Sequence, residues 1–554
     1  MKRKADELAP RAPCRLPRKA VKNEALASQF RLFSIVLVAM ALGACGGGTI
    51  QPPPPSGPYS NASLHGQYAF SMTGVDLNGA YAARVGSFSA DGAGHITGGL
   101  EDVLQLSAGQ PAAQVSFASG NYSVQSNGRG QVTLTAASGG GQLQFSIAFQ
   151  SPNTGFTVET DLNASSTGTF DAQTNADFTN AALANPYVFE LSGVDFSNTS
   201  AAPISMVGKV TTDGGGNITG GVMDSNSGFS SAPSGATAIT PSTYALDSNG
   251  NGANFGRGML TLNGRTFAFY VVDGTHFKML EEDNLGGSAG NALLQTGAIP
   301  TQNSQFTGAF VYQIAGVSVV TSGSQGPITR VARYSADGNG AIGSISLDDN
   351  NDGGYTHISQ GGNISAANYS IDTTNPGSGR GTFTFKDSGS GTFSEVFYMI
   401  SPTQAVVQEN SKGIVGNGPM YAQSSGPFTL ANLAGNFVTS WSGVQLGSTS
   451  AIAFDETFVS QYTLSNKNSS NIAGTVDYVE LGLSSKTLYS SVGVAGNLTV
   501  SNDGTTNNLY KFALNGSPAI TVNFQAYFAN PSTVLLVCSD SIRTTGGIIF
   551  AQQQ

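Results

Sequence analysis

The sequence predicts an all-β protein made of four tandem antiparallel units, and three observations support this fold class. Gly is unusually frequent, with 72 copies among 554 residues, while only 10% of the residues are charged. Hydrophobic residues still make up 39% of the chain, which is enough for globular cores. The apolar runs are short and are separated by Gly, Asn and Ser, which are poor helix formers and good turn formers. The chain is also too long for one ordinary core, so several domains are expected.

One strand-like pattern recurs four times along the chain. Large side chains fall on alternate positions, which is the period of a strand with one buried face. The spacings between the aligned aromatic residues are 119, 123 and 127 residues. A period of this length indicates whole repeated domains. The aligned residues are Tyr68, Tyr187, Phe310 and Phe437.

Further landmarks follow in each repeat. An Asp-Gly-x-Gly-x-Ile turn between apolar runs indicates a hairpin, and it begins at Asp91, Asp213 and Asp337. A Gly-Arg-Gly triplet follows, centred on Arg129, Arg257 and Arg380. The fourth repeat has lost both features, so we interpret it as a divergent unit and a candidate terminal cap. Every repeat ends on a glutamine that follows Ala or Leu: Gln173, Gln295, Gln423 and Gln552.

Each unit carries about eight short apolar runs, which predicts an antiparallel meander. Eight strands in about 120 residues suit a small closed β-barrel, because closure removes exposed edges. A two-sheet β-sandwich remains the alternative. The order and spacing of the runs resemble eight-stranded meander barrels of the lipocalin and streptavidin kind. The predicted segments are a lipoprotein signal peptide (1–44), a Gly/Pro-rich tether (45–60), and repeats at 61–175, 176–298, 299–425 and 426–554.

The N-terminal region predicts export and lipid anchoring. A basic front precedes an apolar stretch from Leu32 to Ala44, which is too short to span a bilayer comfortably. The sequence Leu42-Gly43-Ala44-Cys45 resembles the lipobox of bacterial lipoproteins, in which the cysteine sulfur is acylated before cleavage. The resemblance implies lipidation of Cys45. Because Asp directly after that cysteine favours inner-membrane retention in this family, Gly46 implies the outer membrane.

The segment after Cys45 is suited to a tether. Three consecutive glycines give a flexible exit, and the run Pro52 to Pro55 forms a stiff, extended spacer. The repeats themselves resemble those of uncharacterised bacterial exported lipoproteins with tandem all-β repeats. That resemblance covers residues 60 to 554 and implies no activity.

The distribution of charge limits the class of partner. Residues 1–31 hold nine of the 24 Lys and Arg and three of the 34 Asp and Glu, which leaves 15 basic and 31 acidic residues in the body. Phosphate binding needs clustered Lys and Arg, so this acidic body argues against a nucleic-acid partner. With Cys14 in the signal peptide and Cys45 acylated, Cys538 is left alone inside an apolar run, and we expect it to be buried.

The Asp-Gly turns are weak candidates for a metal site. Asp91, Asp213 and Asp337 are each followed eleven residues later by another acid, an interval that could curl back to one calcium ion. The intervening residues have a strand pattern, however, and a strand carries the second acid far from the turn. We therefore expect structural turns and predict no bound metal or cofactor.

Other acidic residues recur near the end of the first three repeats. Glu281-Glu282-Asp283 in the second repeat matches Glu159 and Asp161 in the first and Glu409 in the third. A glycosidase needs two carboxylates a few ångströms apart, but strand ends that meet solvent explain these residues more simply. The recurring arginines could pair with these acids across strands. The single tryptophan, Trp441, aligns with apolar residues and is expected in a core.

These features predict a membrane-anchored extracytoplasmic lipoprotein with a non-catalytic role in adhesion, envelope structure or binding. The membrane, reached through the lipid anchor, is the one partner that the sequence predicts; cell-surface or extracellular ligands are not identified. No catalytic constellation is found, so an enzyme is not expected. Two alternatives stay open: a carrier that holds small apolar ligands in barrel cavities, and a hydrolase acting on extracellular glycans.

Overall fold

The computed structural model describes residues 59–553 apart from several short segments. Cys14, the lipobox with Cys45 and most of the tether lie outside the described residues. The excepted segments are 108–111, 140, 198–200, 229–232, 320–324, 360–363, 388–390, 427, 430–434, 447–453, 465–470, 483–484, 499–504 and 513–519.

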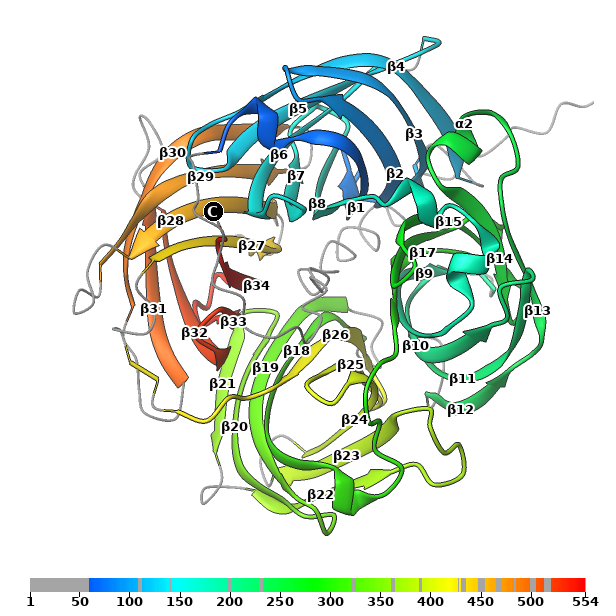
Figure 1. Ribbon diagram of the computed structural model, residues 1–554. Coiled ribbons are helices and arrows are strands. Elements are labelled where there is room, and N and C mark those ends of the chain that lie inside the picture. Colours follow the sequence, from blue (N-terminus) through cyan, green and yellow to red (C-terminus); the bar gives the residue numbers. More distant parts are fainter. Residues whose placement is uncertain are drawn as a thin grey trace, which may run out of the picture.

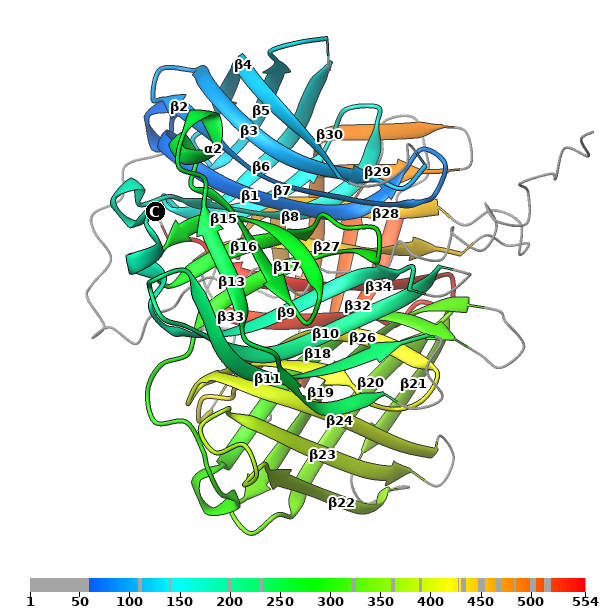
Figure 2. The same ribbon diagram turned by 90° about the vertical axis from the view of Figure 1, so that its right-hand side faces the viewer.

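The protein folds into four antiparallel β units arranged in a ring (Figure 1). Seen from the side, the strands of all four units run across the thickness of the ring, so each unit has one end on each face (Figure 2). The prediction of an all-β chain of tandem meander barrels is confirmed. We call these the first to fourth units in chain order.

The first and fourth units are closed eight-stranded barrels. Consecutive strands pair antiparallel, and the last strand pairs with the first. The first unit comprises β1 (His65–Asp76), β2 (Tyr81–Asp91), β3 (His95–Gln105), β4 (Ala113–Val124), β5 (Arg129–Ala136), β6 (Gln142–Ser151), β7 (Thr154–Glu159) and β8 (Ala164–Ala172). The fourth comprises β27 (Gly435–Gln445), β28 (Phe454–Leu464), β29 (Asn471–Leu481), β30 (Lys486–Leu498), β31 (Thr505–Phe512), β32 (Ile520–Asn530), β33 (Thr533–Cys538) and β34 (Arg543–Ala551).

The second unit has nine strands instead of the expected eight, because its fourth strand is split. Pro241 lies at the break between β12 and β13, and proline has no N–H to donate to a ladder. An additional pairing between β10 and β11 completes the circuit of strands. The strands are β9 (Pro186–Asp195), β10 (Ala202–Thr212), β11 (Asn217–Ser227), β12 (Ser234–Ile239), β13 (Ser242–Leu246), β14 (Arg257–Leu262), β15 (Arg265–Asp273), β16 (His276–Glu281) and β17 (Gly286–Leu294).

The third unit also has nine strands and a split fourth strand. Its sheet ends on β21 and β22, and a single bridge between Ala341 and Asn368 joins the two sides. The strands are β18 (Thr307–Val319), β19 (Gln325–Asp337), β20 (Ile342–Asn351), β21 (Gly354–Ser359), β22 (Ile364–Ile371), β23 (Arg380–Asp387), β24 (Gly391–Ser401), β25 (Gln404–Glu409) and β26 (Ile414–Ala422). The described helical turns of the chain are η1 (Asn61–Ser63), η2 (Asn175–Asp177), η3 (Asn180–Leu183), α2 (Gly250–Asn254) and η4 (Asn303–Gln305).

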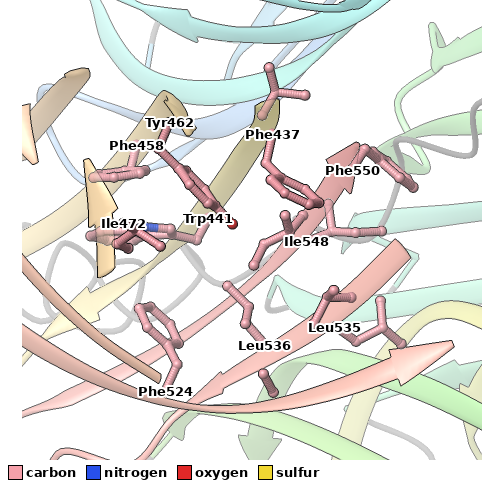
Figure 3. Close-up of a cluster of buried hydrophobic side chains, with 14 of the residues drawn as sticks. Phe437, Trp441, Phe458, Tyr462, Ile472, Phe524, Leu535, Leu536, Ile548 and Phe550 are labelled. Carbon is pink, nitrogen blue, oxygen red and sulfur yellow. The ribbon is translucent and has the colours of Figure 1, made fainter. Parts of the chain in front are cut away.

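Each unit encloses its own apolar core, and every core contains several aromatic side chains. In the fourth unit Trp441 is fully buried and stacks on Phe458, with the ring centroids 4.3 Å apart (Figure 3). The expectation that Trp441 is a core residue is confirmed. Cys538 is also buried, as expected, and its thiol pKa is raised well above the usual value because burial disfavours the thiolate.

The glutamine that ends each repeat joins that unit to the next one around the ring. The side-chain amide of Gln173 donates to the carbonyl oxygens of Phe255 (3.2 Å) and Val271 (2.6 Å) in the second unit. Gln552, at the end of the fourth unit, makes the same pair of bonds to Asn127 (3.0 Å) and Phe149 (2.8 Å) in the first. The chain therefore closes on itself. The equivalent donors at the other two junctions are Gln295 and Gln423.

A buried aspartate on the third strand of each unit forms the second recurrent junction. Asp102 accepts two hydrogen bonds from Arg257, at 2.7 and 3.0 Å, and one from the Tyr270 hydroxyl at 2.7 Å. Paired charge-assisted bonds of this kind are geometrically specific. The matching groups are Asp224 with Arg380 and Tyr398, Asp348 with Tyr527, and Asp477 with Arg129.

Two expectations from the sequence are wrong at these junctions. The Gly-Arg-Gly arginines do not pair with acids of their own repeat's seventh strand; each bonds an aspartate of the preceding unit. The fourth unit is not a terminal cap either, because it packs on both the third and the first units. Phe550 of the fourth unit stacks on Phe156 of the first, with centroids 5.8 Å apart.

Candidate functional site: a cavity in the second unit

The acidic residues near the end of each repeat lie inside the barrels. Glu159, Glu281 and Glu409 end β7, β16 and β25, and each is at most 1% exposed. The expectation that they meet solvent at strand ends is therefore wrong. A buried carboxylate is costly unless it is paired, and every one of these has an arginine within the same barrel.

In the first and third units, the arginine that neutralises this glutamate comes from the second strand of the barrel. In the first unit, Arg84 on β2 lies 2.8 Å from Glu101 and 3.3 Å from Glu159. In the third unit, Arg330 on β19 lies 3.2 Å from Glu395 and also pairs with Glu409. Burial raises the pKa of Glu101 to about 7, although Arg84 opposes this shift.

In the second unit the arginine enters from the opposite side of the barrel. Arg265, at the start of β15, lies 2.6 Å from both Glu281 and Asp195. Burial raises the pKa of Glu281 to about 7 against the opposing effect of Arg265. Burial also acts to raise the pKa of Asp195, but hydrogen bonds from Arg265 and Ser197 outweigh it and lower the pKa. Asp195 is therefore ionised at neutral pH.

A cavity of about 300 Å³ lies beside this ion pair, at the end of the barrel that carries Asp195. It falls at the lower limit of the volumes typical of small-molecule sites. One part of its wall is apolar and the other part carries hydroxyl, amide and charged groups. The apolar residues are Phe189, Leu191, Ile204, Met206, Met223, Leu262 and Phe267. The polar residues are Asp195, Ser197, Ser225, Ser227, Ser234, Thr237, Asn263 and Arg265.

The opposite end of the same barrel is nearly solid. Only about 10 Å³ of free space remains among residues such as Leu183, Phe189 and Tyr244. Phe189 therefore separates a packed half of the barrel from a hollow half. The sequence alone does not reveal this cavity, because it depends on which side chains meet inside the barrel.

The three weak metal candidates lie in hairpin turns. One carboxylate oxygen of Asp91 accepts hydrogen bonds from the backbone amides of Ala93 (2.7 Å) and His95 (3.0 Å). Asp213 and Asp337 make the same two bonds in their own turns. The following glycines have φ values of 80°, 75° and 84°, a region that favours glycine. Among the described residues, no group of three His, Cys, Asp or Glu side chains could hold a metal ion.

The acids eleven residues after these turns lie elsewhere in the fold. Asp102, Asp224 and Asp348 are the junction aspartates described above, and each contacts the neighbouring unit. The repeated Asp spacing therefore reflects one turn residue and one junction residue on the same hairpin arm.

Comparisons with known proteins add little about function. No model of a known protein family matches the sequence, and no curated protein matches it. Solved structures of transferrin binding protein B match at low identity. A double mutant from Haemophilus parasuis Hp5 is 10% identical, with 73% of this chain and 83% of that chain covered and a TM-score of 0.18. The isotype 1 protein from serogroup B Neisseria meningitidis is 8% identical, with 71% and 79% covered and a TM-score of 0.20. These TM-scores are too low to indicate a shared arrangement.

The described part of the chain holds no helix that is both long and apolar enough to cross a membrane.

Proposed function

We propose that the protein is an exported, lipid-anchored binding protein of the bacterial envelope without catalytic activity. Acylation of Cys45 attaches it to the membrane, in our proposal the outer membrane, and residues 45–60 hold the ring away from the lipid surface. The lipobox-like sequence before Cys45 supports the anchor. Several acyl chains on one cysteine make such an anchor stable.

The geometry of the ring supports a fixed orientation on the membrane. The hydroxyl of Tyr59, where the described chain begins, donates to the backbone carbonyl oxygen of Gln553 near its end. The start of β1 pairs with Asp91, so Tyr59 and Gln553 lie on the face that carries the Asp-Gly turns. We infer that this face is turned toward the membrane and that the opposite face points away from it. The cavity of the second unit lies at this distal end.

The state of the carboxylates supports a binding role over the hydrolase alternative. The two glutamates that share Arg330 are 0% exposed, and so is Glu159 beside Arg84. A glycosidase needs two carboxylates on either side of a bound sugar. The one observation that carries the binding role is the cavity of about 300 Å³ beside Asp195 and Arg265, which also favours the carrier alternative.

Labelling with radioactive palmitate tests the anchor. Cells producing the wild-type protein should incorporate label into this chain, and cells producing Cys45→Ser should not, because the serine hydroxyl is not a substrate for thioether formation. Cys14→Ser is the matched control and should leave the label unchanged. Equal label in wild type and Cys45→Ser would refute the anchor. Fractionation of outer and inner membranes then tests the location.

A further inference from the structure

The second unit differs from the first and third units at an interior position that lines the cavity. Strand register places Met206 opposite Leu191, Arg84 opposite Met72, and Arg330 opposite Ile314. Met72, Leu191 and Ile314 occupy the same position on the first strands of their units. Met206 is therefore the counterpart of Arg84 and Arg330. A methionine is shorter than an arginine and brings no charge that must be paired.

The neighbouring interior position changes together with it. Glu101 lies opposite Gly86 in the first unit, and Met223 lies opposite Gly208 in the second. The buried Arg–Glu pair of the first unit is thus replaced by two methionines. The remaining glutamate, Glu281, is neutralised by Arg265 from β15. The two methionines form part of the apolar wall of the cavity, where the first unit has an ion pair.

The wall of the cavity selects for the shape and polarity of a ligand. Phe189 and Phe267 present aromatic rings, and the sulfurs of Met206 and Met223 are polarisable and pack well against aromatic groups. Ser225 pairs with Met206 and follows Met223 by two residues on β11, and its hydroxyl lies 2.6 Å from that of Ser234. Such a wall suits a molecule with an aromatic body and a group at one end that forms hydrogen bonds.

The charges at the cavity argue for a neutral ligand. The guanidinium of Arg265 already contacts both Asp195 and Glu281 at 2.6 Å, so it offers no unpaired positive charge to an anion. Asp195 also accepts from Ser197 at 2.9 Å and is satisfied without a cation. Burying a charged ligand beside this paired network would leave one charge without a partner, which is costly.

We propose that the cavity of the second unit binds one neutral small molecule that has an aromatic body and a hydroxyl or similar hydrogen-bonding end. The interiors of the first and third units, with arginine in place of Met206, do not bind it. This proposal rests on the proposed binding function and adds the class of ligand that the site binds. Anchoring through Cys45 is independent of it, so the palmitate experiment can succeed or fail separately.

Calorimetric titration with three probes of one shape tests the proposal. The probes are 2-naphthol (neutral), 2-naphthoate (anionic) and 2-naphthylmethylammonium (cationic), and the protein is the full chain carrying Cys45→Ser to prevent acylation. We expect one 2-naphthol per chain, with both charged probes binding at least about tenfold more weakly. No binding of 2-naphthol, tighter binding of either ion, or several equivalent sites per chain would overturn the proposal.

Substitutions locate the binding in the second unit. Met223→Trp fills the cavity and should weaken 2-naphthol binding by at least about tenfold. Met259→Trp makes the same change on the half-buried outer side of β14 and should leave binding unchanged. Where Met223→Trp fails to fold by circular dichroism, Ser225→Leu fills part of the same space and should also weaken binding. Unchanged binding in a folded cavity-filled variant would place the probe elsewhere and refute the site.

Discussion

The first and second units place different side chains at one position inside the barrel, although equivalent strands build both. The first unit has Arg84 there, held between Glu101 and Glu159. The second has Met206, and its interior is hollow at the same end. In both units a glutamate at the end of the seventh strand is buried and paired. The two units therefore share a buried glutamate at the end of the seventh strand. The arginine that neutralises it comes from β2 in the first unit and from β15 in the second.

The largest effect should come from removing the arginine of the first unit. Arg84→Met copies the second unit but leaves two buried glutamates without their cation, which should lower the unfolding free energy by about 3–5 kcal/mol. Adding Glu101→Met should recover part of that loss, because one of the unpaired charges is then gone. Thermal unfolding of the single and double variants measures both effects. A double variant less stable than Arg84→Met would contradict this explanation.

A somewhat smaller effect is expected from the glutamate of the second unit. The pKa of Glu281 is raised to about 7 by burial, so the folded state holds a proton that the unfolded chain has released above about pH 4.5. Stability is therefore lost as the pH rises from about 4.5 to 7. Glu281→Gln should remove about 2–3 kcal/mol of the difference in unfolding free energy between pH 5 and pH 8.

Denaturation of wild type and Glu281→Gln at both pH values measures this change. Glu409→Gln in the third unit provides a comparison in a barrel that has Arg330 at the position of Met206. An unaltered pH dependence in Glu281→Gln would show that this carboxyl titrates normally.

The smallest effect distinguishes the packing of the two interiors. Met72 and Leu191 occupy equivalent positions opposite Arg84 and Met206, and Leu191 lines the cavity. Met72→Phe adds atoms opposite the buried Arg84 ion pair and should cost about 1–3 kcal/mol. Leu191→Phe adds atoms beside free space and should cost less than about 1 kcal/mol. Equal losses of stability in the two variants would indicate that the interiors are packed alike.

The repeat period, the strand alternation and the hairpin turns made the fold class predictable from sequence. Alternating large residues around Tyr68 and Tyr187 define the inward face of the first strand, and the Asp-Gly pairs define turns that need a positive φ. The split of the fourth strand in the second unit was not predicted. Pro241 lies at the break, but an isolated proline does not show which strand it interrupts.

The ring and the cavity were not predictable, because both depend on contacts between distant residues. Gln173 and Gln552 recur at the repeat ends, yet a sequence pattern cannot show that their amides cross into the next unit. For the same reason, the sequence suggests that Arg257 pairs with acids of its own repeat, whereas in the structure it pairs with Asp102 of the first unit. The cavity depends on Met206 and Met223 being diagonal neighbours on the paired strands β10 and β11, and methionine in a strand pattern normally indicates an ordinary core.

Xenon binding tests the difference between the two units most directly. Xenon binds in apolar free volume, so a crystal structure of the protein under xenon pressure marks the apolar part of any cavity inside each barrel. We expect a xenon atom between Met206 and Met223 in the second unit and none beside Arg84 or Arg330. Xenon in the first or third unit, or an empty second unit, would contradict the conclusion that the exchange of arginine for methionine opens a cavity.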